Sequence, residues 1–76
     1  MRSPHTPQYQ IMLRQLVLAR RRMGLTQGEA AQALGIPQSR LCRIESGERR
    51  LDVVELEEIA QLYKKPLTFF VPRQKR

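Results

Sequence analysis

The segment from Thr26 to Gly35 is the most informative part of this sequence for the fold. It has a helix start signal at one end and a helix stop signal at the other. Thr26 and Glu29 have the spacing of a capping box, in which each side chain accepts a hydrogen bond from the other residue's free backbone N–H. Gly35 ends the segment, because glycine readily adopts the left-handed conformation that closes a helix. The pattern predicts a helix of about two turns, from Gln27 to about Ala33.

A second short helix follows after a very short connection. Pro37 suits a first helical turn, since its fixed φ fits the helix and its missing N–H leaves no donor unpaired there. Gly47 predicts the end of this helix after about Ser46. Two short helices joined across Gly35 and Ile36 indicate a helix-turn-helix motif.

Further helices are predicted on both sides of this pair. Residues 8–24 have the apolar periodicity of a helix. Asp52 and Glu55 form a second capping box, and Pro66 opens a last helical turn. No segment has the alternating pattern of a strand, so we expect an all-α domain of five helices. The predicted buried positions are Met12, Leu16, Ala19 and Met23 in the first helix and Leu56, Ile59, Ala60 and Tyr63 in the fourth.

The length of 76 residues allows one small domain, whose core alone gives marginal stability. Cys42 is the single cysteine, so no disulfide can form within the chain, and the lack of a Cys/His cluster argues against a structural zinc. We therefore expect stability from helix packing and dimerisation, without a metal or cofactor. We expect a flexible arm over residues 1–8, the folded domain over residues 9–71 and a basic tail over residues 72–76.

The arrangement of charge indicates a polyanionic partner. The net charge is +7, and residues 1–28 carry five arginines and no acid. Residues 59–76 carry five more basic residues and no acid, while all seven acids lie between Glu29 and Glu58. This pattern suggests a basic side that faces nucleic acid and an acidic side opposite, although basic ends could also serve solubility alone.

No membrane or targeting segment is predicted. The apolar run from Ile11 to Ala19 is interrupted by Arg14, so it matches neither a membrane span nor the core of a signal peptide. With a lone thiol, the chain is expected in the cytoplasm and without a membrane partner.

One face of the third predicted helix carries polar side chains. At 100° per residue, Leu41 and Ile44 face the core and the polar set faces outward. Glutamine can pair with adenine, arginine can bind guanine through two hydrogen bonds, serine can contact bases or phosphates, and a small thiol fits a thymine methyl group. An ordinary solvated helix is the alternative. The predicted base-reading residues are Gln38, Ser39, Cys42 and Arg43.

Positions around this helix suit phosphate contacts. Gln27 begins the preceding helix, where its amide and the free N–H groups can hold a phosphate. Arg49 and Arg50 follow in the next loop, where backbone contacts set the register without reading sequence. The predicted phosphate-contacting residues are Gln27, Arg40, Ser46, Arg49 and Arg50.

Three segments form a combined motif: G-L-T-Q-x-E-x-A-x-x-L-G at Gly24–Gly35, Q-S-x-L-x-R-I-E-x-G-x-R at Gln38–Arg49, and the later E-L-x-x-I-A. On these segments, residues 12–71 resemble the Cro/repressor (XRE-like) helix-turn-helix domain of bacterial and phage regulators. The resemblance implies a lambda-repressor-like fold whose third helix enters the major groove of double-stranded DNA. It also implies a homodimer that reads the two halves of a palindromic operator, roughly 34 Å apart.

Carried to matching positions, the resemblance implies base-facing roles for Gln38, Ser39 and Arg43 and a phosphate contact for Gln27. It further implies an ion pair between Arg20 of the first helix and Glu45 of the I-E-x-G segment. Helical projections place both residues at the edge of a buried stripe, so the pairing is geometrically reasonable. Two residues depart from the family pattern. Pro37 replaces a capping Ser or Thr, and Ala30 replaces the usual leucine, which thins the core.

A dense apolar cluster near the end of the chain predicts a dimer interface. The cluster consists of Leu67, Phe69, Phe70 and Val71. One phenylalanine is expected to close the monomer core, and the rest are expected to pack across a two-fold axis. Ile11 and Leu18 project away from the buried stripe of the first helix and are expected to offer a second contact.

The leading hypothesis is a sequence-specific DNA-binding transcription regulator, a dimeric repressor that acts on its own promoter among others. The alternatives are an antitoxin that also neutralises a partner toxin, and a restriction–modification controller protein. An enzyme is not expected, because no carboxylate pair, nucleophile–His pair or Gly-rich phosphate loop is present. Cys42 lacks a histidine partner, since His5 lies in the arm, but a redox-sensitive thiol at Cys42 stays open.

Overall fold

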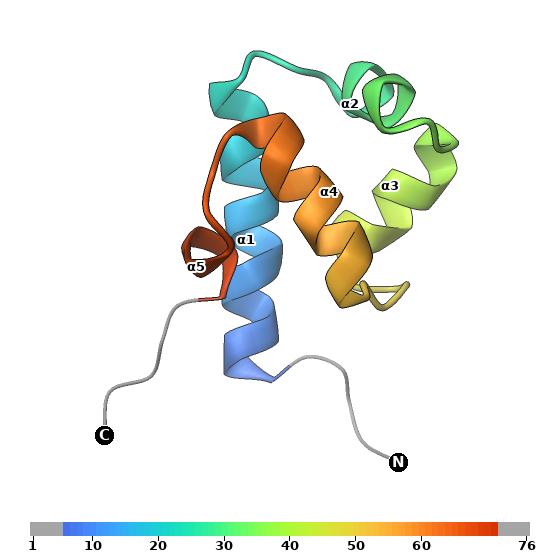
Figure 1. The fold of residues 1–76 in the computed structure, drawn as a ribbon. Helices are drawn as coiled ribbons and strands as arrows, with labels where there is room; N and C mark the ends of the chain where they lie inside the picture. Colours follow the sequence, from blue (N-terminus) through green and yellow to red (C-terminus); the bar gives the residue numbers. More distant parts are fainter. Residues whose placement is uncertain (1–5, 72–76) are drawn as a thin grey trace.

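Five helices make up the described part of the chain, residues 6–71 of the computed structural model. In Figure 1, α1 runs through the centre of the domain, α5 lies to its left, and α2 and α3 lie to its right. No strand occurs among the described residues, so the prediction of an all-α, five-helix domain is confirmed. The helices are α1 (Pro7–Arg22), α2 (Gln27–Leu34), α3 (Gln38–Ser46), α4 (Val53–Tyr63) and α5 (Leu67–Phe70).

The capping signals determine where α2 and α4 begin. The Thr26 side chain accepts a hydrogen bond from the Glu29 N–H at 3.1 Å, and Glu29 Oε1 accepts from the Thr26 N–H at 2.9 Å. Asp52 and Glu55 repeat this exchange at 2.8 and 3.2 Å. Gly35 closes α2 in the left-handed region with φ of 73°. Both predicted capping boxes are therefore present, and both satisfy backbone donors that a helix start leaves unpaired.

The first helix begins earlier than the sequence predicts. Pro7 occupies the first helical turn, and the Thr6 hydroxyl accepts a hydrogen bond from the Tyr9 N–H at 3.2 Å. This cap places residues 7 and 8 in α1 rather than in the predicted arm. Residues 1–5 of the arm and the predicted basic tail lie outside the described residues.

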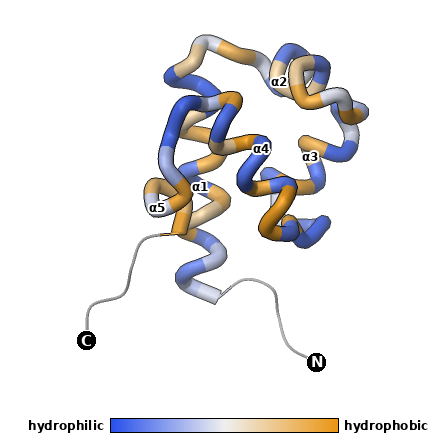
Figure 2. The backbone as a smooth tube through the Cα atoms, in the orientation of Figure 1, coloured by the Kyte–Doolittle hydropathy of each residue, from blue (hydrophilic) through white to orange (hydrophobic). Residues whose placement is uncertain are grey.

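Each helix contributes one face to the hydrophobic core. Figure 2 shows hydrophobic and hydrophilic positions mixed along every helix, as expected when each helix buries one side. Met23 was predicted to be buried, but it is 37% exposed because α1 ends at Arg22 and Met23 only caps it. Within residues 6–71, no helix has both the length and the hydropathy needed to cross a membrane. The buried apolar residues are Met12, Leu13, Leu16, Ala19, Ala30, Ala31, Leu41, Ile44, Leu56, Ile59, Ala60, Tyr63 and Phe70.

The short helix α5 closes the core through Phe70. This side chain is fully buried and meets Phe69 edge to face, with ring centroids 5.2 Å apart. The assignment of Phe70 to a dimer interface is therefore wrong, because a side chain with no exposed surface cannot contact a second chain. Leu67 and Val71 are 40% and 50% exposed, and Phe69 is half-buried.

Candidate nucleic-acid interface

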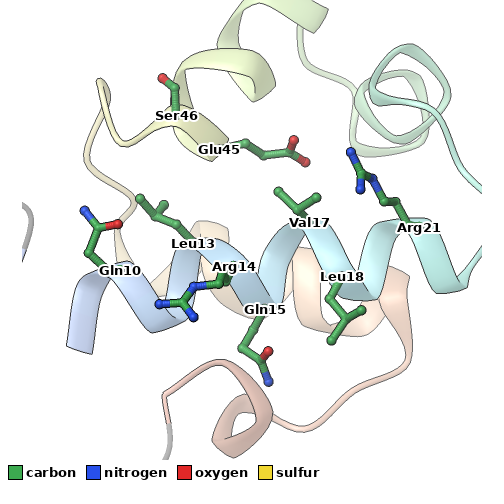
Figure 3. Close-up of a pocket in the computed structure, with 9 residues that line it drawn as sticks. All are labelled: Gln10, Leu13, Arg14, Gln15, Val17, Leu18, Arg21, Glu45 and Ser46. Carbon is green, nitrogen blue, oxygen red and sulfur yellow. The ribbon is translucent and has the colours of Figure 1, made fainter. Parts of the chain in front are cut away.

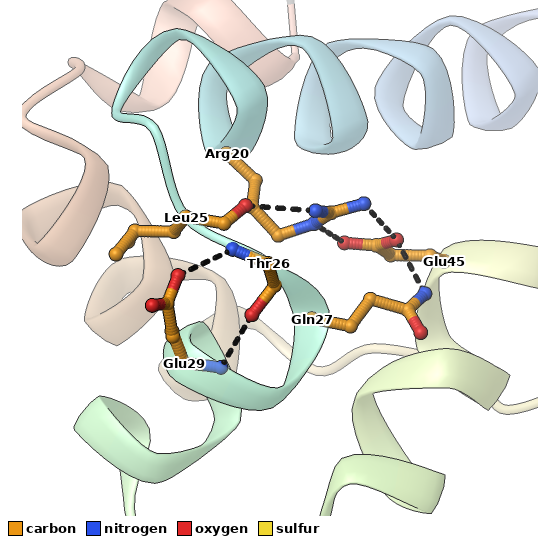
Figure 4. Close-up of polar contacts among 6 residues, drawn as sticks. All are labelled: Arg20, Leu25, Thr26, Gln27, Glu29 and Glu45. Atoms are coloured by element: carbon orange, nitrogen blue, oxygen red, sulfur yellow. Dashed lines mark hydrogen bonds and ion pairs between the residues drawn. The ribbon is translucent and has the colours of Figure 1, made fainter.

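A buried network of hydrogen bonds joins the first three helices. Arg20 donates through Nε to Glu45 Oε2 at 2.7 Å and through Nη2 to Glu45 Oε1 at 3.1 Å. Arg20 Nη1 donates to the carbonyl oxygen of Leu25 at 2.9 Å, and Gln27 Nε2 donates to Glu45 Oε1 at 2.8 Å. Figure 4 shows these contacts between α1, the connection to α2, and α3. We call Arg20, Leu25, Gln27 and Glu45 the buried node.

The ion pair implied by the family resemblance is thus present, and it is almost fully covered. The side chains of Arg20 and Glu45 are 9% and 6% exposed. The hydrogen bond with Glu45 raises the pKa of Arg20 above its ordinary value, while burial lowers it by less. Because either charge alone would be costly to bury, the pair fixes α3 in one orientation against α1.

Tyr63 of α4 interacts with the charges of the buried node but has a hydroxyl that is unpaired within the described chain. The side chain is buried, and its hydroxyl has no hydrogen-bond partner among residues 6–71. Burial, and then the charge of Glu45, raise the pKa of Tyr63 to about 12, while Arg20 opposes them. The phenol therefore stays neutral beside the node at any physiological pH.

The opposite side of α3 is open to solvent. Leu41 and Ile44 hold the helix in the core, each 1% exposed. The four predicted base-reading side chains are all exposed, and none of them makes a hydrogen bond or ion pair with another residue of the described chain. We call this set the reading face; its members are Gln38, Ser39, Cys42 and Arg43.

The start of α3 also leaves backbone donors available. Pro37 is the N-cap residue, with ψ of 148° and no side-chain cap, so α3 begins one residue later than predicted. The N–H groups of Gln38 and Ser39 consequently have no partner within residues 6–71. A Cβ at Gly28 would lie 3.2 Å from Gln38 Oε1, so the glycine lets this side chain lie over the first turn of α2.

A second carboxylate organises the segment after α3. Glu55 Oε2 of α4 accepts hydrogen bonds from Nη2 of Arg40 and, at 3.1 Å, from Nη2 of Arg49. Partial burial raises the pKa of Glu55, but hydrogen bonds from the Asp52 N–H, Arg49 and Arg40 outweigh it and hold the pKa below its ordinary value. We call Arg40, Arg49 and Glu55 the surface cluster. No local spacing pointed to this cluster, since its residues lie on three different segments.

The remaining predicted phosphate contacts lie near the end of α3. The guanidinium of Arg50 stacks over the ring of Tyr9 at 5.4 Å, and the Tyr9 hydroxyl accepts from the Leu51 N–H at 3.2 Å. The Ser46 hydroxyl donates to the Arg43 carbonyl at 3.1 Å and accepts from the Glu48 N–H at 3.3 Å. Arg50 is therefore held against α1, while Ser46 mainly closes its own helix.

An open groove of about 530 Å³ lies between α1 and the last residues of α3. Figure 3 shows Glu45 and Ser46 on one wall and side chains of α1, such as Val17 and Arg21, on the other. No residue of the reading face lines this groove. The groove is therefore a feature separate from the reading face.

Comparison with known proteins agrees with this arrangement. A protein-family model described as helix-turn-helix matches residues 16–70, which include α2, α3 and α4 completely. The chain has no significant match among curated proteins or among solved structures. The match covers well over half of the chain.

Proposed function

The chain belongs to the XRE-type helix-turn-helix family of DNA-binding regulators, and on this premise we propose that it is a dimeric repressor whose α3 reads an operator in the major groove. Bound to a promoter, such a protein represses by occupying the site. The proposal includes its own promoter among the targets and the cytoplasm as its compartment.

The contrast between the two sides of α3 carries this proposal. One side is fixed by Leu41, Ile44 and the buried node, and the other presents the reading face without internal partners. A rigid helix with unpaired donors and acceptors can match base edges without first breaking its own contacts. We therefore assign base reading to Gln38, Ser39, Cys42 and Arg43.

Backbone phosphates are assigned to the groups that surround this helix. The free N–H groups at the start of α3 can donate to a phosphate. The amide of Gln27, assigned to a phosphate from the sequence, donates to Glu45 in the structure and is left out of this set. Each guanidinium of Arg40, Arg49 and Arg50 has five N–H donors and uses only part of them inside the protein. These contacts would supply most of the affinity, with a strong dependence on salt.

The dimer is assigned to the α1–α5 side of the molecule. Leu67 and Val71 are exposed there, beside the half-buried Phe69, and Ile11 and Leu18 of α1 are 40% and 36% exposed. In Figure 1, α5 and α3 lie on opposite sides of α1, so a contact through α5 would leave the reading face uncovered. A two-fold dimer reads the same bases on both strands, which requires an inverted repeat.

Selection of bound sites from random duplex DNA tests the proposal. We expect an inverted repeat. Arg43→Ala should weaken binding about 5- to 150-fold at the base pairs that Arg43 contacts, and should flatten the preference there. Arg14→Ala removes the same charge from an exposed site on α1, so it should weaken all sites slightly and equally. Equal weakening of every site by Arg43→Ala would contradict base reading by Arg43.

A further inference from the structure

Glu55 receives donors from three separate segments of the chain. Its Oε2 accepts from Arg40 of α3 and Arg49 of the α3–α4 loop, and its Oε1 accepts from the N–H of Asp52 at the start of α4. The Arg49 N–H in turn donates to the carbonyl of Arg43 at 3.1 Å, which ties the loop back to α3. One side chain therefore fixes two arginines relative to the reading helix.

The two arginines are held but not covered. Their side chains are 38% (Arg40) and 42% (Arg49) exposed, whereas that of Glu55 is 18% exposed. The Nε of Arg40 is buried without a hydrogen-bond partner among residues 6–71, so holding this guanidinium in place has a cost. Each arginine donates to Glu55 through Nη2 alone, so N–H donors remain on its partly exposed guanidinium. Two positive charges share one negative charge, so the cluster still attracts an anion.

We propose that Glu55 is a positioning residue for DNA, which holds Arg40 and Arg49 together so that both donate to the phosphate backbone beside the reading helix. This inference rests on the proposed function, because it needs DNA as the ligand. Long arginine side chains lose much rotamer freedom when they bind, and a partner that orders them beforehand removes part of that cost. Glu55 is too covered, and has the wrong charge, to contact a phosphate itself.

Charge alone predicts the opposite effect of Glu55. A carboxylate near DNA repels phosphates, so its removal should strengthen binding if it does nothing else. If Glu55 positions the arginines, its removal should weaken binding although the net charge rises. The direction of the change therefore separates the two roles.

The test compares Glu55→Gln with Glu57→Gln on the operator obtained by selection. Glutamine can replace glutamate in a capping box, so α4 keeps its start. Glu57 is exposed on the same helix and has no partner among the described residues, which makes it a matched loss of one charge. We expect Glu55→Gln to weaken binding on the order of tenfold at every sequence, and to lower the slope of log K against log salt by about one. Glu57→Gln should leave binding unchanged or tighten it.

A second comparison excludes a merely structural effect. In the Arg40→Ala/Arg49→Ala background, Glu55→Gln should cause no further loss, because the residue acts through these arginines. The inference is overturned if Glu55→Gln binds as tightly as the wild type or tighter, or if it weakens the double variant by the same factor. A wild-type protein that selects no DNA at all would instead refute the proposed function.

Discussion

Glu45 and Glu55 are two carboxylates with similar partners in different surroundings. Each accepts three hydrogen bonds, and in each case at least one comes from arginine. Glu45 and Arg20 are 6% and 9% exposed, whereas the arginines around Glu55 are 38% and 42% exposed. The arginine of the first carboxylate is almost fully covered and donates three hydrogen bonds within the described chain. The second carboxylate leaves part of two guanidinium groups to the solvent.

Burial decides what an ion pair does in this domain. A buried pair adds little net stability, but removing one partner leaves a charge without compensation. An exposed pair is weak, because solvent screens it and side-chain entropy opposes it. The buried node therefore determines how the helices are oriented, and the surface cluster determines which N–H groups face outward.

Glu45→Gln should have the largest effect on stability. The change strands the charge of Arg20, so we expect a loss of about 3–5 kcal/mol in the free energy of unfolding. Urea unfolding followed by circular dichroism would measure it, with Glu57→Gln as the exposed control. If the two variants differ by less than about 1 kcal/mol, the node is not the structural element that its burial indicates.

Glu55→Gln should lose less than about 1 kcal/mol at neutral pH, because the cluster is exposed. The pKa of Glu55 is below its ordinary value in the folded state, so its contribution is present above about pH 4.3 and is lost as the pH falls through the lower, folded-state value. The difference between wild type and variant should therefore shrink as the pH is lowered from 5 to 3. A difference that is as large at pH 3 as at pH 7 would refute this linkage.

Tyr63→Phe should have the smallest effect at neutral pH, within about 0.5 kcal/mol, because its hydroxyl has no partner to lose. In the folded state the pKa is about 12 against an ordinary 10.0, so the unfolded chain releases the phenol proton first. This contribution is full below pH 10 and is lost as the pH rises towards 12. The wild type should thus lose stability faster than the variant in that range. A loss above 1 kcal/mol at pH 7 would show that the hydroxyl does contribute to stability and would contradict this prediction.

The local parts of this architecture could be predicted from the sequence. Capping boxes involve residues three apart, so the pairs at Thr26 and Asp52 were recognisable and determined where α2 and α4 begin. Periodicity identified most of the core, but it failed at Met23, where the helix had already ended. The outward face of α3 followed from helical geometry alone.

The contacts between segments could not be predicted in the same way. Arg40 and Glu55 are 15 residues apart on different helices, so their pairing depends on how α3 packs against α4. The same holds for Gln27, whose amide was assigned to a phosphate and in the structure donates to Glu45. The pair of Arg20 and Glu45 was expected only because of the family resemblance, not from the spacing of the two residues.

The isolation of the reading face has a consequence for how such a protein can change. Its four side chains support no other residue of the described chain, so substitutions there should alter the recognised sequence at little cost in stability. A population of variants could then explore new operators one residue at a time while every member still folds. The recognised DNA sequence could therefore diverge readily. Arg20 and Glu45 could change only together, because replacing one of them leaves the other's charge buried without a partner.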